Sequence, residues 1–69
     1  MIAVGTKVIG DWGAGIPLSY GTIASIANYV VEVVWDDLTP GYYRISEIGG
    51  DYYSETSNKI GIYEDRRRS

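Results

Sequence analysis

The chain has 69 residues with no cysteine and no histidine, which excludes disulfides, zinc fingers, cysteine nucleophiles and histidine general bases. A hydrophobic fraction of 45% is typical of a folded domain, and the net charge is −3. Three of the six basic residues are Arg66, Arg67 and Arg68, so removing them from the net charge of −3 leaves −6 for the rest. A body with this charge repels a phosphate backbone.

The first half of the chain predicts β-strands, because short runs of Val, Ile and Thr are separated by Gly and Asn and no window keeps helical spacing. The first strand is predicted over residues 6–9, with Val8 pointing inward. The second is predicted over residues 21–27. Its Ile23 and Ile26 are three positions apart, which breaks strict alternation and indicates a β-bulge.

The third strand is predicted over residues 29–35, after a tight turn at Asn28. Glu32 must face water, so alternation places Val31, Val33 and Trp35 on the buried face. The outer face then carries the remaining residues of the strand, Val30, Glu32 and Val34.

Two further strands are predicted over residues 41–45 and 59–63. We expect their inward residues to be Tyr43 and Ile45 in the fourth strand and Ile60 and Ile62 in the fifth. A long Gly-rich first loop spans residues 10–21, and a long polar connection spans residues 47–58. This pattern predicts an all-β fold, a small five-stranded SH3-like barrel. We expect a single domain over residues 1–69, with an ordered core at about 4–64 and a basic tail at 65–69.

Several short motifs occur in an order that resembles the Mind bomb/HERC-type domain, an SH3-like β-barrel module of large ubiquitin ligases. They are Val4-Gly5-Thr6-Lys7-Val8, Asp11-Trp12, Gly21-Thr22-Ile23, the run from Val31 to Asp36, Tyr43-Arg44 and Gly49-Gly50. KOW and Tudor-like small barrels form the wider group. The resemblance covers residues 4–53, although the first loop is shorter than the family's and contains Pro17. It implies an SH3-like barrel that binds protein segments.

Aromatic residues give the main functional signal, because the chain has two tryptophans and seven tyrosines but no phenylalanine. Tyrosine suits half-exposed positions and binding surfaces. In SH3-like folds the first loop lies near the loops beside the third and fourth strands. The predicted binding groove consists of Asp11, Trp12, Asp36, Tyr42 and Tyr52. Such a groove suits a basic or Pro-rich protein or peptide partner, bound without catalysis and without a cofactor or metal.

Enzymatic activity is not expected from these residue types. Asp36 and Asp37 are adjacent, so their side chains diverge in a strand or tight turn. The serines have no histidine to activate them. Gly10, Gly13 and Gly15 are not followed by the Lys-Ser/Thr of a phosphate-binding loop, so they are interpreted as turn residues.

Two alternative functions remain open. One is a nucleic-acid-associated KOW/Tudor-like module that acts through Arg66 to Arg68, which the acidic body disfavours. The other is an oligomeric phage or bacterial accessory or inhibitory protein, assembled through a strand edge or through the face of Val30 and Val34. The longest apolar runs are too short to span a bilayer and the N-terminus does not resemble a signal peptide, so we expect no membrane association and a cytoplasmic location.

Overall fold

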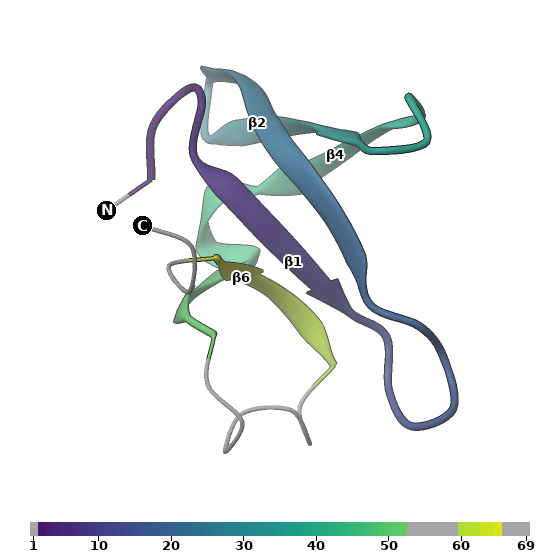
Figure 1. The fold of residues 1–69 in the computed structure, drawn as a ribbon. Coiled ribbons are helices and arrows are strands. Elements are labelled where there is room, and N and C mark those ends of the chain that lie inside the picture. The colour runs from purple at the N-terminus through teal and green to yellow at the C-terminus, as the bar shows by residue number, and fades with distance from the viewer. Residues whose placement is uncertain (1, 53–59, 66–69) are drawn as a thin grey trace.

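The computed structural model describes residues 2–52 and 60–65, which form one curled, half-barrel β-sheet (Figure 1). Its order is β4-β3-β2-β1-β6-β5, and only the β5–β6 pair is parallel. The strands are β1 (Lys7–Asp11), β2 (Ser19–Ala27), β3 (Val30–Trp35), β4 (Pro40–Arg44), β5 (Ile48–Asp51) and β6 (Gly61–Glu64), with a 3-10 helix η1 (Ile45–Glu47) before β5. The all-β prediction is confirmed, with six strands where five were expected. The predicted Arg66 to Arg68 tail lies outside the described residues.

Strand β1 lies inside the sheet, between β2 and β6 (Figure 1). Val8 is 1% exposed and Ile9 is 0% exposed, so both faces of this strand are buried. Val8 belongs to the main core, as predicted, whereas Ile9 points to the opposite face, where the register pairs it with Tyr20 and Tyr63. The second buried face was not anticipated, because nothing in the local sequence shows that both faces of β1 are covered.

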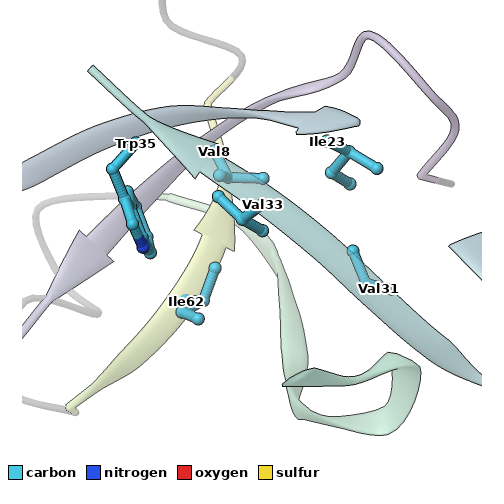
Figure 2. Close-up of a cluster of buried hydrophobic side chains, with 6 residues drawn as sticks. All are labelled: Val8, Ile23, Val31, Val33, Trp35 and Ile62. Atoms are coloured by element: carbon cyan, nitrogen blue, oxygen red, sulfur yellow. The ribbon is translucent and has the colours of Figure 1, made fainter. Parts of the chain in front are cut away.

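The core is a cluster of six buried side chains that face one another from β1, β2, β3 and β6 (Figure 2). The members are Val8, Ile23, Val31, Val33, Trp35 and Ile62. The predicted alternation of β3 is confirmed, because Val31, Val33 and Trp35 are buried while Val30 is exposed. Each fully buried aliphatic side chain contributes about 1.5–3 kcal/mol relative to exposure. This cluster is therefore the main source of stability in a chain without disulfides.

The β2–β3 hairpin explains two features of the sequence. The register shifts between Ile23 and Ser25, so the predicted bulge is confirmed. Asn28 and Tyr29 have φ angles of 52° and 65° and connect the paired residues Ala27 and Val30. Two consecutive residues with positive φ form a type I′ turn, which matches the twist of the flanking strands. The tight turn was predicted, but it includes Tyr29, which was assigned to the strand.

Three expectations in the second half of the chain are wrong. Ile45 lies in η1 rather than in β4 and is partly exposed. Ile60 is 70% exposed because β6 begins one residue later and only Ile62 reaches the core. The connection expected over residues 47–58 contains β5, and its residues 53–58 lie outside the described part of the chain, as does Lys59 of the predicted fifth strand.

Strand β4 forms one edge of the sheet, and its register shows which backbone groups face outward. The N–H of Ile45 donates to the carbonyl of Tyr29 at 2.8 Å. These two residues are the next pair along the β3–β4 ladder after Val30 and Arg44, so they form a hydrogen-bonded pair. Hydrogen-bonded pairs alternate with non-hydrogen-bonded pairs along an antiparallel ladder. The residues whose backbone groups point away from β3 are therefore Pro40, Tyr42 and Arg44.

The outward backbone donors of β4 are largely removed. Pro40 has no N–H, and the N–H of Arg44 donates to Oε1 of Glu47 at 2.8 Å. Among the described residues, only Tyr42 keeps an outward N–H on this strand without a partner. An edge with one free donor is a poor template for another strand.

Candidate functional site

Two of the five predicted binding residues, Asp11 and Tyr52, are buried. Asp11 ends β1 at 3% exposure, and its Oδ1 accepts the N–H of Gly13 at 3.1 Å. Its Oδ2 accepts the hydroxyl of Tyr52 at 3.3 Å. Tyr52 is 8% exposed, and its ring packs edge-on against Tyr63 with centroids 5.7 Å apart. These contacts tie the end of β1 to the segment after β5, so the pair supports the fold rather than presenting a surface.

Trp12 directly follows β1 and is held in place by its neighbours. Its ring packs edge-on against Trp35 with centroids 5.7 Å apart, and its Nε1–H donates to Oγ of Ser19 at 2.8 Å. A Cβ at Gly10 would lie 2.5 Å from the Trp12 ring, so glycine is needed for this close approach. Trp12 is therefore a fixed, half-buried wall rather than a protruding side chain.

A cavity of about 300 Å³ lies at this end of the sheet, and we call it the indole cavity. It is lined by Trp12, Leu18, Ser19, Tyr20, Trp35, Asp36, Asp37 and Thr39. The connection between β1 and β2 forms one wall and the turn between β3 and β4 forms the other. Of the predicted site residues, Trp12 and Asp36 meet here.

The two carboxylates of the turn differ in their partners. Oδ1 of Asp37 accepts the hydroxyl of Thr39 at 2.6 Å and the backbone N–H of Thr39 at 3.0 Å. The hydroxyl bond, followed by the backbone bond, lowers the pKa of Asp37 below its usual value of 3.8. Asp36 is exposed, and its side chain has no hydrogen bond or ion pair with any described residue. The carboxylate available to a ligand is therefore that of Asp36.

Tyr42 lies away from this cavity. It is 65% exposed on β4 and pairs with Glu32 across the β3–β4 ladder, on the outer face. The structure therefore does not bring the five predicted residues into one groove: two are buried together, two line the indole cavity and Tyr42 is separate.

A second cavity, of about 330 Å³, adjoins the first, and we call it the lysine cavity. It is lined by Lys7, Val8, Tyr20, Gly21, Asp36 and Asp65. Tyr20 and Asp36 line both cavities. Sequence reasoning missed Tyr20 because the second strand was predicted to begin at residue 21. The alternation of Tyr20 with Thr22 is the signal that would have extended the strand.

Other site types find no support in the described residues. No group of three or more acidic side chains in residues 2–52 and 60–65 is placed to hold a metal ion. Within the same residues, no helix has the length and apolar character needed to cross a membrane.

Comparison with known proteins does not extend these observations: no family model, curated protein or solved structure matches the chain. The fold and the geometry at hand define a small all-β protein, built on one curled sheet, with two adjoining cavities at the exposed carboxylate of Asp36.

Proposed function

We propose that this protein is a non-catalytic binding domain of SH3-like type that holds a protein segment in the indole cavity. The observation that carries the proposal is the lining of that cavity. Trp12, Trp35 and Tyr20 line it together with Asp36, whose side chain has no hydrogen bond or ion pair with any described residue. A concave site lined by aromatic rings, with a few polar groups, is typical of binding sites.

The chemistry of the lining favours binding over catalysis. The titratable groups are the phenol of Tyr20 and the carboxylates of Asp36 and Asp37. Asp37 accepts two hydrogen bonds from Thr39 and has a lowered pKa, so it is a poor proton donor near neutral pH. The resemblance to the Mind bomb/HERC-type domain points to the same kind of role, because that family binds protein segments.

The two tryptophans make a direct test practical, since each contributes one indole N–H resonance and both residues line the cavity. Peptides would be selected from a random displayed library on the immobilised protein and then titrated into labelled protein by NMR. We expect the selected peptides to shift both indole signals and the amide of Asp36. A selection that yields no peptide above background, or peptides that shift only residues distant from the cavity, would refute the proposal.

A matched pair of variants in one turn controls the result. Asp36→Ala removes the free carboxylate, whereas Leu38→Ala removes an 82% exposed side chain that lines neither cavity. We expect the first to weaken peptide binding and the second to leave it unchanged. Equal losses of peptide binding in the two variants would show that binding depends on the turn as a whole and not on the cavity.

A further inference from the structure

Trp35 carries a polar group that the core leaves unpaired. Its Nε1–H donates no hydrogen bond within the described part of the chain. In that part, every fully buried side-chain nitrogen or oxygen has a hydrogen-bond partner. The Trp35 nitrogen is therefore open to solvent, although the residue as a whole is only 9% exposed. The other indole differs, because the Nε1–H of Trp12 donates to Oγ of Ser19 at 2.8 Å.

The packing of the Trp35 ring shows which of its edges is open. A Cβ at Gly21 would lie 2.9 Å from Cε3 of Trp35, and a Cβ at Gly10 would lie 3.0 Å from Cη2. These two carbons therefore rest on the backbones of β2 and β1. In an indole, Nε1 lies on the long edge opposite to that of Cε3, so the Trp35 nitrogen points away from β2. Figure 2 shows the ring at the border of the aliphatic cluster.

Two aromatic neighbours hold the Trp35 ring in place. Trp12 packs against it with centroids 5.7 Å apart and planes at 69°, and Tyr43 packs against it with centroids 6.3 Å apart and planes at 80°. A donor that is fixed before binding loses little conformational freedom when a ligand arrives. A ligand that excludes water from an unpaired donor must supply an acceptor, because an unsatisfied buried N–H is costly.

The side chains near the two indoles offer no free acceptor. Oγ of Ser19 already accepts the N–H of Trp12. Tyr20 precedes Gly21, which pairs with Trp35, so alternation directs the Tyr20 ring to the opposite face of the sheet. A ligand N–H that is buried against the indoles would therefore lose its hydrogen bond to water without gaining another from these side chains.

The carboxylates lie at the rim of the cavity. Asp36 and Asp37 belong to the turn after β3, where every residue from 36 to 39 is exposed. Oδ1 of Asp37 already accepts two hydrogen bonds from Thr39. The turn can receive N–H groups of ligand residues outside the cavity, but not a donor buried beside the indoles. The group that fits beside the indoles is therefore an acceptor without a donor of its own.

We propose that the N–H of Trp35 opens into the indole cavity and binds the carbonyl oxygen of an X-Pro peptide bond. This inference rests on the proposed function and specifies its ligand. The X-Pro bond is a tertiary amide, so it satisfies Trp35 without burying an N–H. The proline ring is compact and apolar, which suits a wall of indoles. A proline-containing segment also favours the extended polyproline II conformation before it binds, which lowers the entropic cost.

Three blocked pentapeptides of the form Ser-Ala-Z-Ala-Ser test the ligand, with proline, N-methylalanine or alanine at Z. They are titrated into the intact protein and followed through the two indole N–H resonances. We expect the proline peptide to bind about tenfold more tightly than the alanine peptide, whose N–H is buried without an acceptor, and N-methylalanine to lie between them. The Trp35 proton should move downfield and exchange more slowly with water, while the bonded Trp12 proton should change less. Equal binding of the proline and alanine peptides would overturn the inference.

The same replacement at each indole locates the hydrogen bond. Benzothienylalanine keeps two fused rings but has sulfur in place of the N–H, and a chain of 69 residues without cysteine can be made by chemical synthesis. At Trp35 the replacement should weaken binding of the proline peptide about fivefold. At Trp12 it removes only the bond to Ser19, so binding should fall less. Equal losses would show that the Trp35 N–H is not the donor. Amide spectra establish that both variants fold, and the three peptides decide the question on the unmodified protein if one does not.

The outcomes separate this inference from the proposed function. A fourth peptide carries arginine at Z, and tighter binding of that peptide than of the proline peptide would overturn the preference for a neutral acceptor while leaving a peptide-binding cavity in place. A proline peptide that shifts the Trp12 proton but not the Trp35 proton would overturn the assigned donor. If none of the pentapeptides binds, the inference fails, and the library selection alone decides whether the domain binds peptides.

Discussion

The hydroxyl of Tyr52 donates a hydrogen bond of 3.3 Å to Oδ2 of Asp11, joining residues 41 positions apart in the sequence. Asp11 ends β1 and Tyr52 follows β5, and β6 lies between these two strands in the sheet. Both side chains are buried, so the Tyr52 hydroxyl takes the place of a water molecule as a hydrogen-bond donor to the Asp11 carboxylate. The same carboxylate also accepts the N–H of Gly13. The hydrogen bond therefore links the end of β5, an edge strand, to the end of β1 in the interior of the sheet.

Tyr52→Phe should therefore destabilise the fold. The variant keeps the ring that packs against Tyr63 but leaves one oxygen of the buried Asp11 carboxylate without its partner. We expect the free energy of unfolding to fall by about 1–3 kcal/mol, measured by urea denaturation. Tyr42→Phe is the control, because Tyr42 is 65% exposed and should change stability by less than about 0.5 kcal/mol. Equal stability of the two variants would mean that the Tyr52–Asp11 bond contributes nothing.

Tyr29→Gly should stabilise the protein. Tyr29 has a φ of 65°, a conformation that costs a non-glycine residue about 1–2 kcal/mol, and its side chain is 81% exposed. The change gives Asn28-Gly, the preferred pair for a type I′ turn. Allowing for the greater freedom of glycine in the unfolded chain, we expect a gain of about 0.5–1 kcal/mol by urea denaturation. Tyr29→Ala removes the ring without relieving the backbone, so a similar gain in that variant would contradict the explanation.

The turn after β3 should contribute a pH-dependent stabilisation. Hydrogen bonds from the hydroxyl and then the N–H of Thr39 lower the pKa of Asp37 below 3.8. A carboxyl whose pKa is lower in the folded state stabilises the fold above its unfolded value, and that stabilisation is lost as the pH falls through the lowered folded value. Thr39→Val removes the hydroxyl, so the pKa of Asp37 should rise towards 3.8 in an NMR titration. An unchanged pKa in that variant would show that the hydroxyl is not the main cause.

The protein should self-associate through the edge of β4 when the outward N–H donors of this strand are restored. Pro40→Ala supplies an N–H, and Glu47→Ala releases the N–H of Arg44. The double variant should associate increasingly with concentration in sedimentation velocity, because three outward donors then lie along the strand. The single Glu47→Ala variant should associate less. A double variant that sediments like the unmodified protein at every concentration would show that the edge is protected in another way.

Local patterns in the sequence predicted the features that depend on near neighbours. The alternation of Val31, Val33 and Trp35 reveals their shared face, because a strand has a period of two. The three-residue spacing of Ile23 and Ile26 reveals the bulge. In both cases the flanking residues determine the outcome, so pattern and structure agree.

Features that depend on distant contacts were not accessible in this way. Strand β5 contains Gly49-Gly50, and glycine is depleted in strands, so only its pairing with β6 makes it a strand. The burial of Ile9 could not be predicted, because nothing in the local sequence shows that both faces of β1 are covered. Asp11 and Tyr52 were read as surface residues for the same reason, since the bond between them crosses most of the chain.

The position of β1 between β2 and β6 has a consequence for the order in which the protein can be built. During synthesis, β2, β3 and β4 can pair as soon as each has emerged, because each lies next to its predecessor in the chain. Strand β1 precedes these strands, yet its second neighbour, Gly61–Glu64, is made only after β2, β3 and β4. Until then Val8 and Ile9 belong to an unfinished edge, and joining them to β6 requires closure of a long loop. We therefore expect this late closure, rather than hairpin formation, to set the folding rate.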